Sequence, residues 1–183
     1  IIFIVYIFFL LPYSITMANE EASYDVVHKT NIYEVRYYSD RLVAQVTNKG
    51  DNNSFRKLFN YISGENKNSE KIAMTIPVTQ TKKDGELFMQ FYLPSKFNKE
   101  TTPIPTNPDL EITTIPEGYF AVIKFSGRSS DKNFEKYNKI LKQKLLEDKI
   151  PINGFAVRAT YNSPFTLPPL RRNEAMFSID WKN

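Results

Sequence analysis

Residues 33–46 read YEVRYYSDRLVAQV, in which apolar and polar side chains alternate on both sides of a short polar break at 39–40. Alternation with a period of two is typical of β-strands that bury one face. A break at 50–53 then supplies a helix cap. Large apolar residues follow at the i, i+3, i+4, i+7 spacing of one helix face: Phe55, Leu58, Phe59 and Ile62. Gly64 ends this helix, and two more alternating stretches complete a ββαββ unit over 33–93.

The same order of elements returns over 110–181, again as two strands, an amphipathic helix and two strands. The apolar stripe of the second helix consists of Phe134, Tyr137, Leu141 and Leu145. A tandem repeat of this kind predicts one domain with an approximate two-fold axis and a shared groove that can hold a ligand. We therefore expect an α+β fold, in which a curved antiparallel sheet or distorted β-barrel carries both helices on one side.

Local signals refine this architecture. Pro77 interrupts the alternation over 72–78, which predicts either an edge strand or a bulge. Asp84-Gly85 predicts a hairpin turn. Residues 94–109 contain four prolines and predict an extended connector between two halves that would each bury too little alone.

Composition limits the chemistry that this chain can perform. With 183 residues, 42% of them hydrophobic, the chain is long enough for one globular domain with a real core. The net charge of +4 comes from lysines and arginines scattered among acids, so we expect no nucleic-acid partner. The absence of cysteine excludes disulfides, thiolate nucleophiles and cysteine-ligated metals. The single histidine, His28, excludes metal sites built from several imidazoles.

The first 16 residues, IIFIVYIFFLLPYSIT, carry no charge and are almost entirely apolar. The run is shorter than a membrane span of about 20 residues and matches the hydrophobic region of a secretory signal. Thr16 and Ala18 suit the positions before a cleavage site, so 1–18 is predicted as a signal peptide and 19–183 as a single exported domain without a membrane span. One alternative is translation from Met17, with an untranslated upstream segment and a cytoplasmic protein. A folded N-terminal strand is the other alternative.

The string KIAMTIPVTQ (71–80) resembles the signature strand of the SOUL/haem-binding protein family. Six further segments match the family in order and spacing: YEVRYY (33–38), FNYISGEN (59–66), LPSKF (93–97), AVIKFSGR (121–128), YNSPF (161–165) and RRNE (171–174). The resemblance covers roughly 24–181, and its wording is most similar to bacterial-type members. It implies a distorted barrel with two helices and pseudo-two-fold symmetry.

The same resemblance implies that haem or a related tetrapyrrole binds non-covalently in a hydrophobic groove between the first helix and the strand with the YNSP-like motif. By position, the residues implied are Phe55, Phe59 and Tyr161. Asn52 stands where some relatives have a basic residue, so Arg56 is the nearest basic substitute for pairing with a propionate. The alternative for both phenylalanines is core packing, because they share a stripe with Leu58.

Iron ligation is less well specified by the sequence. Some relatives have a histidine proposed as iron ligand where this chain has Tyr37, and tyrosinate ligates ferric haem in catalase. An aromatic core residue is the alternative for Tyr37, and a surface or edge residue is the alternative for His28. Met74 and Met89 are possible axial ligands or core fillers. Three basic residues can bind propionates or be ordinary surface charges: Lys96, Arg171 and Arg172.

No catalytic group stands out, so we expect a binding protein and not an enzyme. The acidic residues considered for acid–base work are scattered: Glu34, Asp131, Glu135 and Glu174. The expected function is to bind a tetrapyrrole as carrier, buffer or sensor. The alternative is an effector-sensing or protein-interaction domain that binds other hydrophobic ligands, since tandem units of this shape also occur in bacterial regulators. An enzyme acting on a tetrapyrrole is the third hypothesis.

Overall fold

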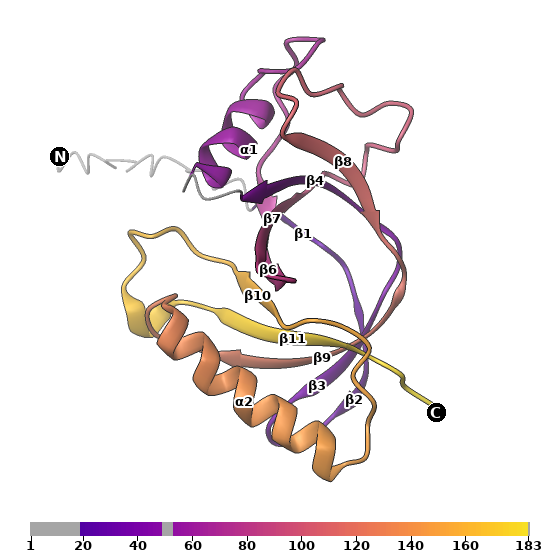
Figure 1. Ribbon diagram of the computed structural model, residues 1–183, viewed down its shortest axis with the longest axis vertical. Helices are drawn as coiled ribbons and strands as arrows, with labels where there is room; N and C mark the ends of the chain where they lie inside the picture. Colours follow the sequence, from indigo (N-terminus) through magenta and orange to yellow (C-terminus); the bar gives the residue numbers. More distant parts are fainter. Residues whose placement is uncertain (1–18, 49–52, 183) are drawn as a thin grey trace, which may run out of the picture.

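The computed structural model describes residues 19–48 and 53–182; the predicted signal peptide (1–18) and Asn52 lie outside them. The described chain forms a nine-stranded antiparallel sheet that curls into a half-barrel and carries two α-helices (Figure 1). The predicted α+β fold is therefore confirmed. Neither helix is long and apolar enough to cross a membrane, among the residues described.

The strands follow the order β2-β3-β9-β11-β10-β6-β7-β4-β8 across the sheet. Their bounds are β2 (Asp25–Lys29), β3 (Glu34–Tyr38), β4 (Arg41–Asn48), β6 (Val78–Lys83), β7 (Glu86–Tyr92), β8 (Leu110–Ile115), β9 (Gly118–Phe125), β10 (Val157–Thr160) and β11 (Asn173–Ile179). The helices are α1 (Ser54–Ile62) and α2 (Asp131–Glu147). A short parallel pair, β1 (Glu20–Glu21) and β5 (Thr75–Ile76), lies outside the main sheet.

The two repeats meet at the centre of the sheet, where β6 pairs with β10. Outward from this pair, β6-β7-β4-β8 corresponds to β10-β11-β9-β3. The first strand of each repeat thus pairs with the second strand of the other repeat, β3 with β9 and β8 with β4. The breaks at 39–40 and 116–117 therefore connect the two halves and do not close hairpins. Asp84 and Gly85 do close the β6–β7 hairpin, with φ values of 52° and 88°.

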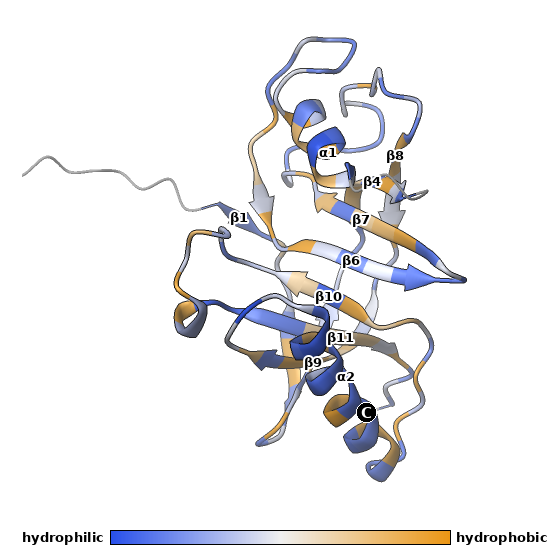
Figure 2. Cartoon of the chain, turned by 60° about the vertical axis from the view of Figure 1, so that its left-hand side comes forward, coloured by the Kyte–Doolittle hydropathy of each residue, from blue (hydrophilic) through white to orange (hydrophobic). Residues whose placement is uncertain are grey.

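Both helices pack against the same face of the sheet, on the outside of its curve (Figure 1). Val78 of β6 packs in the cluster beneath α1. Gln80 shares that face, because it lies two residues further along the strand, and it pairs with Arg158 of β10. Arg158 places its guanidinium 4.7 Å from the ring of Phe134 in α2. The outward side of α2 is largely hydrophilic, as its lysines predict (Figure 2).

The inner, concave face of the sheet is also buried, which the alternating pattern did not predict. Arg36 was expected on the exposed side of a half-buried strand, yet its side chain is completely buried. The curl of the sheet closes this face on itself and gathers a third cluster there: Tyr38, Phe120, Val122, Ala159, Tyr161 and Met176. Polar residues on the inner side of these strands therefore need partners within the protein.

Two details of the strands differ from expectation. Pro77 lies between β5 and β6 and belongs to neither strand, so the predicted stretch 72–78 is divided: β5 is an edge of the two-stranded sheet, whereas β6 is central in the main sheet. The edge strand β2 was not predicted. All five of its residues are exposed, so it has no half-buried alternation to recognise.

Candidate functional site

A cavity of about 610 Å³ opens between α1 and the loop that follows β10. It brings together Phe55, Phe59 and Tyr161, three of the four residues implied for haem binding. Its remaining lining residues are Asn19, Met74, Ile76, Val78, Gln80, Met89, Ser129, Thr160, Asn162, Ser163, Pro164 and Arg171. Apolar walls with a few polar groups at this volume are typical of small-molecule sites.

Phe55 and Phe59 form the aromatic wall of the cavity. They lie four residues apart and so stand one above the other on a single face of α1. Their ring centroids are 6.2 Å apart and the ring planes differ by 11°. The four apolar residues predicted for one face of this helix fall into two pairs. Leu58 and Ile62 are buried in the core, whereas the side chains of Phe55 and Phe59 are 49% and 50% exposed. Phe55 contacts the buried Phe91 edge-on, with ring centroids 5.3 Å apart, so core packing accounts for only part of the surface of these two side chains.

The floor of the cavity comes from the outer face of the central strands. Met74 and Ile76 precede β6, Val78 begins it, and Met89 belongs to the neighbouring β7. These four side chains are only partly buried. Met74, Val78 and Met89 pack against the cluster beneath α1, and the part of each side chain that stays accessible gives the cavity an apolar floor.

Tyr161 closes the side of the cavity next to the loop. Its hydroxyl donates a 2.7 Å hydrogen bond to Oε2 of Glu174, and the Arg172 guanidinium lies 3.6 Å from its ring centroid. Burial, followed by the negative charge of Glu174, raises the pKa of Tyr161 far above its usual value. The phenol is therefore neutral, and its oxygen is already engaged in a hydrogen bond.

The basic candidates are distributed unequally around the cavity. Arg171 lines it and donates from Nε to the Thr166 carbonyl (2.7 Å) and from Nη2 to the Pro164 carbonyl (2.6 Å). Arg56 is exposed and is not among the lining residues. Two further candidates also lie elsewhere: Lys96, near Glu70, and Arg172, on the inner face.

Of the residues considered as iron ligands, Met74 and Met89 line this cavity, whereas Tyr37 and His28 do not. Tyr37 donates a 2.6 Å hydrogen bond to Glu117, which raises the pKa of its phenol. His28 packs against Trp181, with ring centroids 5.1 Å apart. Both residues belong to the β2–β3 edge, far along the sheet order from the β4–β7 region that supports α1. Within the described residues, no group of three or more histidine, aspartate or glutamate side chains could hold a metal ion.

A buried ionic network beneath Tyr161 was missed from the sequence. Arg36 and Glu174 form a bidentate pair with both N–O distances at 3.0 Å and both side chains completely buried. Glu34 also binds Arg36, while Arg172 binds both Glu174 and Glu21. The sequence held one sign of this network. Residues two apart on a strand lie on the same face, which places Glu34 beside Arg36 and Arg172 beside Glu174. The network holds Glu174 in place, and with it the Tyr161 side chain that is hydrogen-bonded to Glu174.

Comparison with known proteins gives one family match. Residues 19–178 match the family model described as SOUL heme-binding protein. Heme-binding protein 2 of Mus musculus is 29% identical over 180 residues, covering 91% of this chain and 86% of that protein. Its Homo sapiens counterpart is 30% identical over 161 residues, covering 80% and 77%. The crystal structure of the EcmrR C-terminal domain shares the fold, with a TM-score of 0.61 at 11% identity, covering 86% of this chain and 98% of that one.

Proposed function

This chain belongs to the SOUL heme-binding protein family, and from that membership we propose that it binds haem or a related tetrapyrrole non-covalently in the cavity beside α1. The observation that carries the proposal is the pair of nearly parallel, half-exposed rings of Phe55 and Phe59 above an apolar floor. A flat macrocycle can cover both rings at once. Covering about 100 Å² on each ring is worth roughly 5 kcal/mol, before the cost of association.

The charged groups of the ligand have one partner at the cavity. A tetrapyrrole propionate that approaches Arg171 can form a charge-assisted hydrogen bond. The Arg171 Nε and Nη2 atoms already hold the loop carbonyls of Thr166 and Pro164, which orients the guanidinium before a ligand arrives. Arg56, on the exposed surface of the same helix as the phenylalanines, is the second cation that a propionate outside the cavity can reach.

The lining residues fit the macrocycle better than they fit its iron. The possible axial ligands at the cavity are the Met74 and Met89 sulfurs and the Tyr161 oxygen. Tyr161 stays protonated because burial, followed by the charge of the Glu174 carboxylate, raises the pKa of its phenol. We therefore propose binding without a strong axial ligand from the protein, a property suited to a carrier, buffer or sensor that releases its ligand.

Binding without catalysis is the role that these lining residues support. The polar members of the described lining are amides, hydroxyls and one guanidinium, with no carboxylate or imidazole among them: Asn19, Gln80, Ser129, Thr160, Tyr161, Asn162, Ser163 and Arg171. Such groups orient a ligand but do not form an acid–base pair at neutral pH.

A second candidate function is sensing of other flat hydrophobic molecules, and the weak provision for iron favours it. The absorption spectrum of the protein purified without added ligand tests the first function, since a bound tetrapyrrole gives a Soret band. Competition between hemin and unrelated lipophilic dyes then separates the two. Preferential retention of hemin supports the haem proposal, whereas equal displacement by every dye supports the second.

A further inference from the structure

The loop between β10 and β11 displays a concentrated apolar surface. Its residues Phe165, Leu170 and Leu167 are 93%, 72% and 66% exposed, which places them among the four most exposed large hydrophobic side chains of the described chain. All three belong to the segment 163–170, which we call the apolar loop and which projects from one side of the sheet (Figure 1). Single exposed hydrophobic side chains are ordinary, but three on one projecting loop mark an interaction surface.

Hydrogen bonds hold the apolar loop in one shape. Arg171 donates from Nε to the Thr166 carbonyl at 2.7 Å and from Nη2 to the Pro164 carbonyl at 2.6 Å. The Gly127 amide donates to the Pro168 carbonyl at 2.8 Å and so ties the loop to the segment that follows β9. The loop backbone is therefore fixed from two sides, while its large apolar side chains stay exposed.

The backbone of the apolar loop suits an apolar environment. Its three prolines have no N–H group to desolvate. The amide of Thr166 donates to the Ser163 carbonyl at 3.0 Å, and that of Phe165 to the Ser163 hydroxyl at 3.3 Å. The Leu170 amide donates to the Leu167 carbonyl at 2.9 Å. Because unpaired N–H groups oppose transfer into lipid, a loop whose donors are mostly absent or paired enters a bilayer more readily.

The charges beside the apolar loop are positive. Arg171 follows it directly, and the exposed Arg128 lies in the segment that is hydrogen-bonded to it. Neither 126–130 nor 161–171 contains an acidic residue. Asp131, the next acid along the chain, forms a salt bridge with an arginine of β10. Cations beside an apolar tip are complementary to the anionic headgroups of a lipid bilayer.

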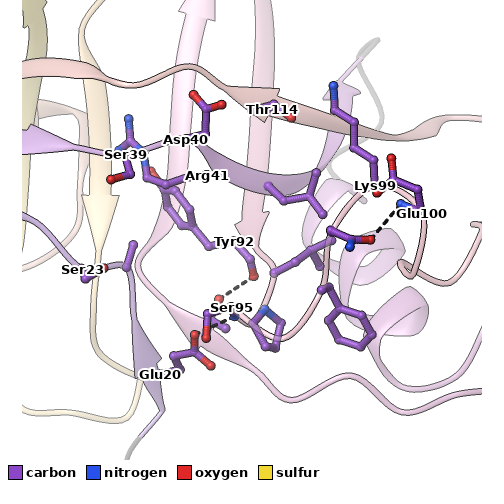
Figure 3. Close-up of a pocket in the computed structure, with 17 residues that line it drawn as sticks. Glu20, Ser23, Ser39, Asp40, Arg41, Tyr92, Ser95, Lys99, Glu100 and Thr114 are labelled. Carbon is purple, nitrogen blue, oxygen red and sulfur yellow. Dashed lines mark hydrogen bonds between the residues drawn. The ribbon is translucent and has the colours of Figure 1, made fainter.

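A pocket elsewhere on the protein shows a surface of the opposite kind. It has a volume of about 450 Å³, lies next to β1 and has charged lining residues of both signs: Glu20, Asp40, Arg41, Lys99 and Glu100 (Figure 3). The apolar loop has no charged residue within 163–170. Side chains as exposed as that of Phe165 stand on a projection, which a fluid bilayer accommodates, whereas a protein partner needs a pocket of matching shape.

We propose that the apolar loop docks the protein onto an anionic lipid bilayer, with the side chains of Phe165, Leu167 and Leu170 inserted at the level of the upper acyl chains. Arg128 and Arg171 add positive charge at the headgroups. Arg171 also lines the haem cavity, so a docked protein holds that cavity beside the bilayer. Docking itself does not depend on haem. Passage of a tetrapyrrole between bilayer and cavity rests on the proposed function.

A tryptophan placed in the apolar loop tests insertion directly. Because 1–16 is itself apolar, the signal must come from the loop and not from the whole chain. Phe165→Trp supplies it in the full chain, since lipids with brominated acyl chains quench a tryptophan that enters the bilayer. With brominated phosphatidylcholine vesicles that contain about one-third phosphatidylserine, we expect at least about a twofold loss of its emission relative to unbrominated vesicles.

Leu146→Trp is the matched control for this reporter. Leu146 is 73% exposed and lies in the last turn of α2, outside the apolar loop. Its variant should lose no larger share of emission than the wild-type chain, whose only tryptophan is Trp181.

Two charge variants of the Phe165→Trp chain test the role of the cations. Arg128→Glu should raise the lipid concentration for half-maximal quenching about tenfold or more, because it replaces attraction to the anionic surface by repulsion. Lys99→Glu makes the same change of charge in the surface pocket of Figure 3 and should alter that concentration by less than about twofold. Vesicles of phosphatidylcholine alone should require about tenfold more lipid than those with phosphatidylserine.

Three results would each overturn the proposal: no quenching of Phe165→Trp, equal quenching of Leu146→Trp, or equal quenching with and without phosphatidylserine. A wild-type dimer that Phe165→Ser dissociates, without quenching of the loop reporter, would overturn it in favour of a second copy of this chain. Phe165 does not line the haem cavity, so Phe165→Ser should retain the hemin affinity of the wild type. Hemin titration in parallel therefore separates a failure of docking from a failure of haem binding.

Discussion

The rings of Phe55 and Phe59 stack on one flank of α1 with their planes 11° apart, and half of each side chain remains exposed. Aromatic side chains of this size normally bury most of their surface in a domain core. Here the buried share of the helix belongs to Leu58, Tyr61 and Ile62. The stacked pair is thus available to a ligand without any rearrangement of the core.

Replacing either ring should therefore weaken haem binding, and Phe59→Ala should affect folding less than Phe55→Ala, which also loses the contact with Phe91. For Phe55→Ala and Phe59→Ala we expect losses of about 1–2 kcal/mol each, or roughly tenfold in Kd. Phe155→Ala is the matched control, because Phe155 is 46% exposed and does not line the cavity. Equal affinity of the three variants for hemin would place the ligand elsewhere.

Tyr161→Phe separates the structural role of Tyr161 from iron ligation. The variant loses the 2.7 Å hydrogen bond to Glu174 and should lower the free energy of unfolding by about 1–2 kcal/mol in urea denaturation. The Soret maximum of the haem complex should not move, since the neutral phenol is not an iron ligand. A shifted Soret maximum with an unchanged free energy of unfolding would identify Tyr161 as an iron ligand and not as a structural residue.

Glu174→Gln should be far more destabilising than an exposed substitution of the same kind. It leaves the buried Arg36 without half of its carboxylate partners, and breaking a buried pair in this way costs about 3–5 kcal/mol. Glu147→Gln is the control, because Glu147 and Lys144 form an exposed pair one helical turn apart. Similar unfolding midpoints for the two variants would contradict the importance of the network.

Removal of His28 or Tyr37 should leave haem binding intact. Neither residue lines the cavity, and Tyr37 is hydrogen-bonded to Glu117. We expect His28→Ala and Tyr37→Phe to retain the Soret maximum and hemin affinity of the wild-type protein. Loss of either property in one variant would identify that residue as a ligand and relocate the site.

Stability should fall in alkaline solution as buried tyrosines ionise. Burial raises the pKa of Tyr61 to about 12, above the unfolded value of about 10. The contribution of Tyr61 is then fully present below pH 10 and decreases as the pH rises from about 10 to about 12, since the unfolded chain loses its proton first. Tyrosinate absorbance and urea titrations should show this slope, and Tyr61→Phe should reduce it by up to one proton.

The repeat, the helices and the aromatic pair could be predicted because their signals are local. Phe55 and Phe59 follow from helical spacing and from resemblance to a family. Arg56 was predicted as a basic substitute because it follows Phe55 directly in the sequence. Successive residues of a helix point about 100° apart, however, and Arg56 does not line the cavity.

Other features depend on the whole fold and could not be predicted from local patterns. The pairing of β3 with β9 joins segments from opposite repeats. Alternation correctly placed Arg36 opposite the helix-covered face, but it gave no sign that the sheet curls and buries that side as well. The buried ionic network results from this curvature.

Equilibrium titration of the wild-type protein and the Phe55→Ala/Phe59→Ala double variant with hemin, followed at the Soret band, is the most direct test of the proposed function. The account predicts saturable one-to-one binding at micromolar hemin for the wild type and roughly hundredfold weaker binding for the correctly folded double variant. An unchanged Soret band with the wild type, or the same affinity in both proteins, would contradict it.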